Sequence, residues 1–300
     1  MRIVVTGATG NVGTALLDVL ESGGDELVGV ARRLPDTTVA RYRAASWCAP
    51  ERGEPPMWHT NDHGTRHVLD AVVAAGVPRV VALSSVAAYA PAPRWEKVAA
   101  DMPCDGIETS AYSRGKAALE NLLDRFEENY PEVGVARLRP CAILRRRAAG
   151  EFQRWLPGPA LPARLVGDRR LPIPLWTDLR AQAVHSADVA GAIRLVLESG
   201  FTGAMNLAAP GILGAAALAG PLGGIRVPAP RPLVRAAVYA ETALGWRPRY
   251  DAAQVVADLV AGLRAEAGEA SPPLASPRRD GFLPRLRSLA RARPSHRSQS

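Results

Sequence analysis

The first twenty residues place three evenly spaced glycines between an apolar run and a helical pattern. The apolar run begins at Ile3 and is short, as expected of a strand buried on both faces of a parallel sheet. Gly7, Gly10 and Gly13 follow it, and residues 14–20 repeat apolar positions with a helical period. A glycine-rich turn between a strand and a helix predicts an α/β fold built on a parallel sheet.

Each of the three glycines has its own physical role in such a turn. Gly7 lets the chain turn sharply off the strand, Gly10 lets a pyrophosphate approach the backbone, and Gly13 lets the helix pack close to the sheet. The free N–H groups at the start of the helix then face the phosphates, with the positive end of the helix dipole behind them. This context favours a dinucleotide site over a glycine-rich turn that binds nothing.

The length of 300 residues fits one α/β domain with a smaller lobe. We expect a Rossmann-type dinucleotide-binding domain over residues 1–144 and a mixed segment of substrate lobe and returning sheet elements over residues 145–265. A disordered tail rich in arginine, proline and serine is expected over residues 266–300. No apolar run approaches the roughly 20 residues of a membrane span, and no secretory segment precedes the first strand. We therefore expect a cytoplasmic protein with no membrane partner.

The formal net charge of +8 is concentrated near the C-terminus. From residue 271 onward the chain has seven arginines and one acid, Asp280, so the residues before this stretch are close to neutral. A basic surface spread over the whole fold would favour nucleic acid, whereas this distribution does not. We expect a small-molecule substrate and no specific nucleic acid partner.

Histidines and cysteines do not form a metal site in the sequence. His63 and His67 share a face of one expected helix, but no third ligand is evident, which favours solvent exposure. The cysteines lie far apart, which argues against a disulfide framework. Cys141, at the end of an expected strand, is interpreted as a small core residue.

The residues after the second expected strand bear on the cofactor. Residues 27–31 read as this strand, and sites that prefer NAD place an acid at its end to bind the ribose 2′-hydroxyl. Here Arg32 and Arg33 follow instead. An arginine at this point can pair with a 2′-phosphate, so NADP is favoured over NAD. The alternative is that both arginines face water.

The stretch between residues 34 and 60 contains at most one further strand, over residues 39–44. Residues 49–56 contain three prolines and read as a turn, which cannot be a central strand. A helix is expected over residues 66–75, followed by a buried strand over residues 79–84. The fold is therefore expected to lack one strand between residues 34 and 60.

Ser85, Tyr112 and Lys116 form the constellation that carries chemistry. Ser85 follows the buried strand, at the edge where open α/β sheets bind ligands. Tyr112 and Lys116 lie four residues apart on an amphipathic helix expected over residues 111–129, so their side chains share a face. A neighbouring ammonium favours a phenolate, which can exchange a proton with a substrate hydroxyl or carbonyl while a serine holds the same oxygen.

Several further elements are expected in the second half of the chain. A strand is expected over residues 133–138 and another over residues 204–207, with irregular structure over residues 145–180. Asp188 is expected near the N-cap of a helix that ends at Leu197. Two more helices are expected over residues 233–244 and 251–265.

Most of residues 1 to about 262 resembles the extended short-chain dehydrogenase/reductase family, the NAD-dependent epimerase/dehydratase group. Seven segments carry this resemblance: Thr6-Gly-Ala-Thr-Gly-Asn-Val-Gly13, Asn61-x-x-Gly64-Thr65, Leu83-Ser-Ser-Val-Ala-Ala-Tyr89, Tyr112-x-x-x-Lys116, Arg137-Leu-Arg-Pro140, Val184-His-Ser-Ala-Asp188 and Leu244-Gly-Trp-Arg-Pro248.

The resemblance implies roles for individual residues. Ser85 matches the catalytic Ser/Thr, Tyr112 the catalytic acid/base and Lys116 its partner. The remaining implied contacts are to the cofactor, with Asn11 and Val12 at the pyrophosphate and Pro140 at the start of the loop beside the nicotinamide. The family typically forms homodimers and places a fourth strand next to the first, in a stretch that is short here.

The expected function is that of an NAD(P)-dependent oxidoreductase, epimerase or dehydratase that acts on a hydroxyl or carbonyl carbon by hydride transfer. Nucleotide sugars, steroids and small carbonyl compounds all remain open as substrates. The short stretch after the second strand also motivates an alternative, a non-catalytic member that senses NAD(P) or binds another protein.

Overall fold

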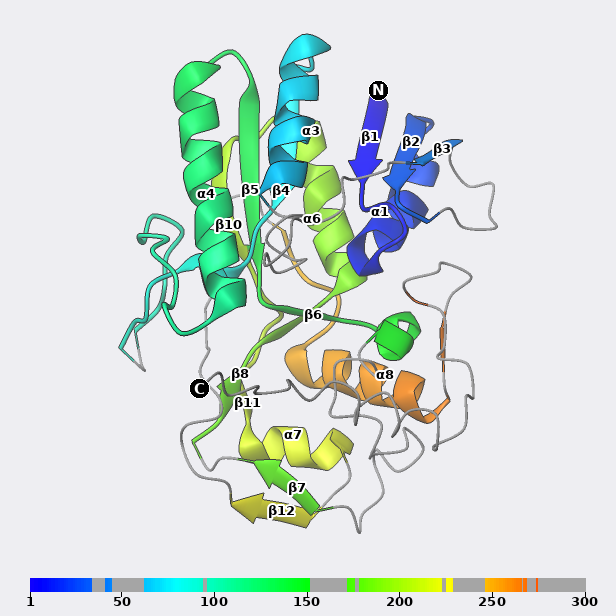
Figure 1. Cartoon of the computed structure of the whole chain (residues 1–300). Coiled ribbons are helices and arrows are strands. Elements are labelled where there is room, and N and C mark those ends of the chain that lie inside the picture. Colours follow the sequence, from blue (N-terminus) through cyan, green and yellow to red (C-terminus); the bar gives the residue numbers. More distant parts are fainter. Residues whose placement is uncertain are drawn as a thin grey trace, which may run out of the picture.

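The computed structural model of the chain describes residues 1–33, 41–44, 62–93, 96–151, 172–175, 178–222, 225–228, 246–265, 267–268 and 274. Figure 1 shows an upper part of parallel strands and long helices above a smaller lobe of short strands and helices. This arrangement confirms the α/β fold with parallel sheets that the sequence predicts.

The N-terminal part of the chain forms a three-stranded parallel sheet. Strand β1 (Arg2–Thr6) pairs with β2 (Glu26–Ala31), and β2 pairs with β3 (Arg41–Ala44). Helix α1 (Asn11–Glu21) connects β1 to β2, and its apolar face is buried. This is the βαβ unit expected from the glycine turn.

A second three-stranded parallel sheet follows in the order β10-β5-β4. Strand β4 spans Arg79–Leu83, β5 spans Gly134–Pro140 and β10 spans Gly203–Leu207. The three helices that accompany this sheet are α3 (His63–Ala74), α4 (Ala111–Asn129) and α6 (Ser186–Ser199).

Within the described residues, no strand pairing joins the two sheets. Strand β1 pairs only with β2, and β4 pairs only with β5. Between β2 and α3, β3 is the single strand in the part of the chain that the structure describes. A strand in the middle of such a sheet is normally buried on both faces, yet Val4 in β1 is 57% exposed. The expected lack of a strand between residues 34 and 60 stays a prediction, because only residues 41–44 of this stretch are among the described residues.

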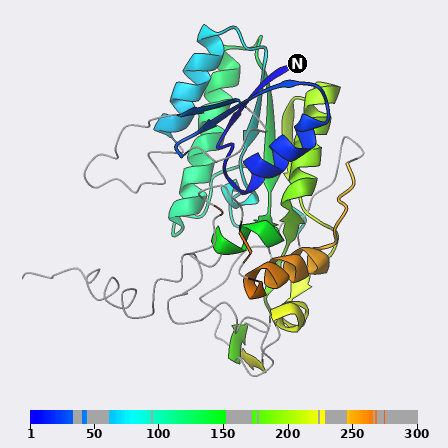
Figure 2. The same ribbon diagram turned by 90° about the vertical axis from the view of Figure 1, so that its right-hand side faces the viewer.

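Helices on both faces cover the strands, as in a doubly wound fold. Figure 2 shows α3 and α4 on one side of the strands and α1 and α6 on the other. Leucines of α1 and the apolar residues of α6 share one core with residues of β5 and β10. On the opposite face, Leu69 of α3 and Leu123 and Phe126 of α4 pack with Val135 of β5. The α1–α6 layer therefore connects the two sheets.

The smaller lobe is built from short elements around helix α8 (Ala252–Arg264). The remaining elements are η1 (Val86–Ala88), β6 (Ala142–Leu144), η2 (Arg146–Ala148), β7 (Pro172–Leu175), β8 (Arg180–Ala181), β9 (Ala183–His185), β11 (Leu213–Gly214), α7 (Ala215–Leu222) and β12 (Ile225–Pro228). The pairs are β6 with β9, β8 with β11 and β7 with β12. Val255, Leu259 and Leu263 of α8 pack on Leu144 and Ala183, which joins the lobe to the strands above it.

The N-terminus of α6 agrees with the prediction that Asp188 lies near the N-cap. The N-cap is His185, whose Nδ1 accepts a hydrogen bond from the Ala187 N–H at 3.2 Å. Asp188 lies in the first turn, and its carboxylate accepts from the N–H groups of Arg249 and Tyr250. The acid is used for a long-range contact that its local position does not reveal.

The helix expected over residues 233–244 and the turn expected over residues 49–56 lie outside the described residues, as does most of the tail expected over residues 266–300. Of the expected tail, the structure describes Ala267, Gly268 and Leu274, and Leu274 is fully buried.

We expect Gly13→Ala to destabilise the fold. A Cβ atom at residue 13 would lie 2.3 Å from the carbonyl oxygen of Gly7 and 2.7 Å from the Cα atom of Ala8, so the turn would have to move. Overpacking of this kind costs about 1 to 3 kcal/mol. The measurement is the free energy of unfolding by urea.

Gly191→Ala is the matched control, because Gly191 also lies in a helix but a Cβ there meets nothing within 4 Å. This control should be neutral or more stable by up to about 1 kcal/mol. Equal effects of the two substitutions would contradict the packing argument.

Candidate functional site

The glycine turn is tied to the end of β2 by its own backbone. The N–H groups of Gly7 and Ala8 both donate to the carbonyl oxygen of Val30, at 3.0 and 3.3 Å. Gly7 has a φ of +69°, a backbone conformation that residues with L side chains rarely adopt. The Gly10 N–H donates to the Gly7 carbonyl oxygen. The expected role of Gly7 in a sharp turn therefore rests on backbone conformation.

Gly13 is required for a reason slightly different from the expected one. The sequence analysis assigned it to close packing of α1 on the sheet. A Cβ there would instead meet the backbone of Gly7 and Ala8 within the turn itself. The third glycine therefore lets the helix fold back onto the turn that precedes it.

The start of α1 has the properties of an anion site. Gly10 is the N-cap and forms no side-chain cap hydrogen bond in the described part of the chain, and the first turn carries no acid. The N–H groups of Asn11, Val12 and Gly13 thus have no side-chain cap there. Asn11 donates from Nδ2 to the Ile143 carbonyl oxygen at 3.0 Å, while its Oδ1 atom is buried without a partner among the described residues. These features fit a dinucleotide pyrophosphate.

Ser85 lies at the carboxyl end of β4, as the sequence predicts. It is the N-cap of η1 and is 7% exposed. Its Oγ accepts from the Ala87 N–H at 3.1 Å and donates to the Pro140 carbonyl oxygen at 3.4 Å. The structure thus brings together two residues that the sequence analysis assigned separately to the substrate and to the nicotinamide loop.

Tyr112 and Lys116 lie in the first turns of α4. Tyr112 is 41% exposed, and its hydroxyl makes no hydrogen bond within the described residues. Lys116 is half-buried, and its Nζ donates to the Leu83 carbonyl oxygen at 3.1 Å, two residues before Ser85. Burial lowers the pKa of the Lys116 ammonium, while the charge of Glu120 opposes this shift. Lys116 therefore lies at the same strand end as Ser85.

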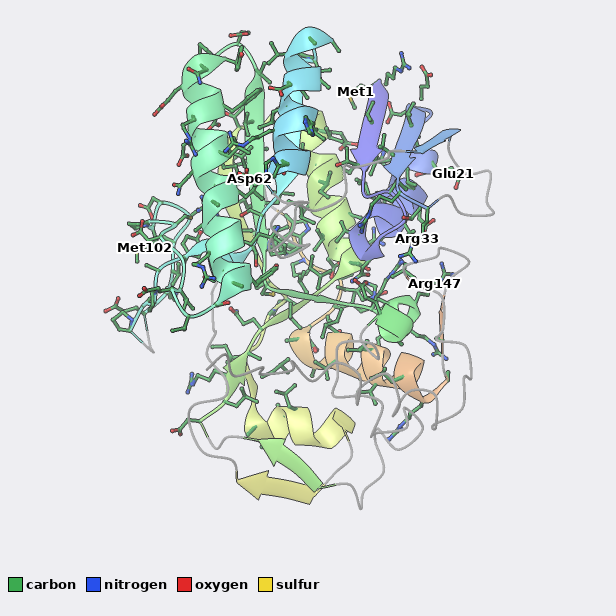
Figure 3. All side chains as sticks on the ribbon, viewed as in Figure 1. Met1, Glu21, Arg33, Asp62, Met102 and Arg147 are labelled. Carbon is green, nitrogen blue, oxygen red and sulfur yellow. The ribbon has the colours of Figure 1, made fainter. Side chains whose placement is uncertain are left out.

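Arg32 follows β2 directly and is exposed. Figure 3 shows the neighbouring Arg33 on the side of the molecule with the β1–β2–β3 sheet, whereas Met102, in the loop before α4, lies on the opposite side. The cofactor residues and the proposed reacting residues thus come from both sheets. Asn11 links the two groups through Ile143, three residues after Pro140.

A buried polar cluster beside Ser85 was missed by the sequence analysis. Arg139 of β5 donates from Nε and Nη2 to the two carboxylate oxygens of Glu120 on α4, each at 2.8 Å. Its Nη1 donates to the Tyr89 hydroxyl at 2.9 Å, and that hydroxyl donates to Asn206 Oδ1 at 2.6 Å. Arg137 lies on the same side of β5 and also contacts Glu120.

The cluster holds the loop between η1 and α4 in place. Asn206 Nδ2 donates to the Val98 carbonyl oxygen at 2.9 Å, and Arg139 Nη1 donates to that of Ala100 at 2.7 Å. Burial is the largest influence on Glu120 and opposes its ionisation, but the hydrogen bonds from Arg139, the Ser84 hydroxyl and the charges of Arg139 and Arg137 together keep the pKa of this acid below its ordinary value. The helical spacing places Glu120 one turn after Lys116, but it does not identify Arg139 as the partner of this acid.

Metal ligands and membrane spans were searched among the described residues. No group of three or more histidines, cysteines or acids there could hold a metal ion. His63 and His67 are exposed, and Cys141 packs against the core that α1 and α6 share, with burial raising the pKa of its thiol to about 12. No helix in this part of the chain has both the length and the apolar character needed to cross a bilayer.

We expect Glu120→Gln to destabilise the protein by about 3 to 5 kcal/mol, because it leaves the buried Arg139 guanidinium without its carboxylate partner. The free energy of unfolding at neutral pH measures this effect. Glu198→Gln removes the exposed Arg194–Glu198 pair of α6 and should cost less than about 1 kcal/mol. Similar losses of unfolding free energy for both variants would show that the buried pair stabilises the protein no more than the exposed pair does.

Curated proteins of two mycobacteria match the chain by sequence. The chain is 28% identical over 340 residues to an uncharacterized protein of Mycobacterium tuberculosis, and the match covers 95% of the chain and 34% of that protein. An uncharacterized protein of Mycobacterium bovis matches equally. The chain thus spans about a third of the length of these curated relatives.

Solved structures of nucleotide-sugar enzymes share the fold. A dTDP-glucose 4,6-dehydratase from Bacillus anthracis in complex with NAD has a TM-score of 0.68 at 16% identity, and the match covers 91% of this chain and 99% of that one. A UDP-glucose 4-epimerase from Thermus thermophilus, also with NAD, has a TM-score of 0.65 at 22% identity, with 88% and 99% covered. This likeness confirms the Rossmann-type fold.

The family to which the chain belongs follows from a direct match. The model of the NAD dependent epimerase/dehydratase family matches residues 44–208, more than half of the chain, and includes the strand ends that carry Ser85 and Pro140 as well as helix α4. The protein is therefore a member of the NAD dependent epimerase/dehydratase family.

Proposed function

We propose that this protein is an NAD(P)-dependent oxidoreductase, epimerase or dehydratase that acts on a hydroxyl or carbonyl carbon of a small molecule. One observation carries the proposal. The Ser85 hydroxyl and the Lys116 ammonium both contact carbonyl oxygens at the carboxyl ends of the neighbouring strands β4 and β5, with Tyr112 one helical turn before Lys116. Ligands of open α/β sheets bind at this edge.

The cofactor would be held by the start of α1 and by the edges of both sheets. Gly7, Gly10 and Gly13 with the N–H groups of Asn11 and Val12 would take the pyrophosphate. The other contacts proposed are Arg32 at the ribose and Pro140 beside the nicotinamide. When bound, the nicotinamide supplies the hydride chemistry, and the protein supplies orientation and proton transfer.

The reacting residues would divide the work on the substrate oxygen. The Tyr112 hydroxyl exchanges a proton with this oxygen, and it suits this role because it is exposed and has no competing hydrogen bond within the described residues. Ser85 holds the same oxygen in place, for which its hydroxyl must leave the long 3.4 Å contact with Pro140. Lys116, one helical turn after Tyr112, donates from Nζ to the Leu83 carbonyl oxygen, so its charge lies at the strand end that carries Ser85.

Nucleotide sugars are the first substrate class to test, since the solved structures with this fold include a dTDP-glucose dehydratase and a UDP-glucose epimerase. The homodimer that the family resemblance implies stays a proposal, which light scattering of the purified chain can test.

The first test combines binding and turnover. Titration with NADPH and with NADH, followed by nicotinamide fluorescence, should show binding of at least one of them. Tyr112→Phe should retain this affinity but lower turnover of UDP-glucose, dTDP-glucose or a related sugar by about 10² to 10⁴, the usual contribution of a general acid–base group. Tyr130→Phe, at the far end of α4, is the control and should keep full activity.

A non-catalytic, NAD(P)-sensing role is the second candidate. It is favoured by the absence of strand pairing, within the described residues, between the sheet with the glycine turn and the sheet with Ser85. Under this alternative Tyr112→Phe leaves the biological function unchanged. Loss of that function in the variant would exclude the alternative, whereas absence of binding by either cofactor would exclude both.

The preference for NADP is tested at residue 32. Arg32→Ala should weaken NADPH binding about tenfold, as expected for loss of a charged hydrogen bond worth about 1.4 kcal/mol or more, and should leave NADH binding unchanged. Arg33→Ala, which removes the same charge one residue further on, should have a smaller effect. Equal weakening of NADPH and NADH binding by Arg32→Ala would contradict a contact with the 2′-phosphate.

A further inference from the structure

We propose that Ser113 is a positioning residue that sets the spacing between Ser85 and Tyr112. This inference rests on the proposed function, because it concerns the two side chains that would meet the substrate oxygen. Ser113 follows Tyr112 directly in α4 and is 1% exposed. Its side chain therefore points into the protein while the neighbouring tyrosine is exposed.

The Ser113 hydroxyl joins three segments that are separate in sequence. It donates to the Ala87 carbonyl oxygen in η1 at 2.6 Å and accepts from the Ile107 N–H at 2.6 Å. A hydroxyl has one proton to donate, so it makes one donor contact and one acceptor contact here. The first turn of α4, the 3-10 helix η1 and the end of the intervening loop thus meet at this atom.

Ala87 connects Ser113 to Ser85. The Ala87 N–H donates to Ser85 Oγ at 3.1 Å, and the carbonyl oxygen of the same residue accepts from Ser113. One residue of η1 therefore holds the serine through its N–H group and the helix with Tyr112 through its carbonyl group. A shift of α4 relative to η1 would break the bond between Ser113 and Ala87.

Gly106 closes the junction from the loop side. Its N–H donates to the Ala88 carbonyl oxygen at 2.9 Å, and its φ is +71°. A Cβ at this position would lie 3.1 Å from the Ala117 Cβ, 3.2 Å from the Ser113 carbonyl oxygen and 3.3 Å from its Oγ. The loop therefore packs closely against the helix at Ser113, in space that a side chain at residue 106 would need.

The chain offers a matched control for helix stability. The Ser110 side chain is the N-cap of α4 and accepts from the Ser113 N–H at 3.2 Å. Ser110→Ala should destabilise the same end of the helix. The expected loss of stability is about what the removal of a helix N-cap usually costs. The substitution leaves the bond between Ser113 Oγ and Ala87 in place, so it separates the stability of α4 from its position relative to η1.

The experiment compares Ser113→Ala, Ser113→Thr, Gly106→Ala and Ser110→Ala in the full chain. The readouts are kcat and KM with the sugar nucleotide that the wild type turns over, Kd for NADPH, Tm, and NMR exchange of the Ala87 and Ile107 amides. We expect Ser113→Ala and Gly106→Ala to lower kcat at least about tenfold, because small misplacements of reacting groups have large costs. KM and the NADPH Kd should stay within about twofold.

Two further results distinguish positioning from stability. Ser110→Ala should lower Tm but keep kcat, and Ser113→Thr, which keeps the hydroxyl, should recover part of the activity lost in Ser113→Ala. The proposal is overturned if kcat follows Tm across all four variants, or if Ser113→Ala keeps kcat within about twofold of wild type.

Failure of the proposed function would give a different pattern. In that case the wild type turns over no sugar nucleotide, and amide exchange decides the question alone. Faster exchange at both Ala87 and Ile107 in Ser113→Ala, but not in Ser110→Ala, supports the junction. Unchanged exchange at Ala87 overturns it, because Ser85 would then be held without Ser113.

Discussion

The packing of α1 against α6 is the contact on which the rest of this fold depends. No strand pairing in the described part of the chain joins the β1–β2–β3 sheet to the β10–β5–β4 sheet. The two helices instead form the most extensive contact between described elements, and their buried side chains share one core with strands of both sheets. Apolar packing between these helices therefore connects the described strands of the two sheets.

This arrangement explains how two distant parts of the chain can serve one site. The glycine turn belongs to the first sheet, whereas Ser85, Pro140 and the residues of α4 belong to the second. The α1–α6 core keeps the carboxyl ends of both sheets on the same side of the molecule, and the Asn11 contact with Ile143 adds a polar connection close to the turn. A dinucleotide bound across this edge would contact both sheets.

Much of the fold could be predicted because its signals are local. Helix α4 begins and ends where the amphipathic pattern predicts, and β4 and α8 differ from prediction by a residue at one or both ends. Asp188 lies near the N-cap of α6 as predicted, but the local pattern does not reveal that its carboxylate accepts from the N–H groups of Arg249 and Tyr250. The Arg139–Glu120 pair was missed because nothing near either residue identifies its partner.

The sequence by itself determined the dinucleotide turn, the Tyr112–Lys116 spacing and the serine at a strand end, since each depends on residues within a few positions of one another. Only the tertiary structure decided which residues from distant parts of the chain contact one another. The contact between Ser113 and Ala87 joins residues 26 positions apart, and the one between Tyr89 and Asn206 joins residues 117 apart. Such hydrogen bonds depend on how helices and strands pack, because geometry rather than residue type selects one partner among many polar groups.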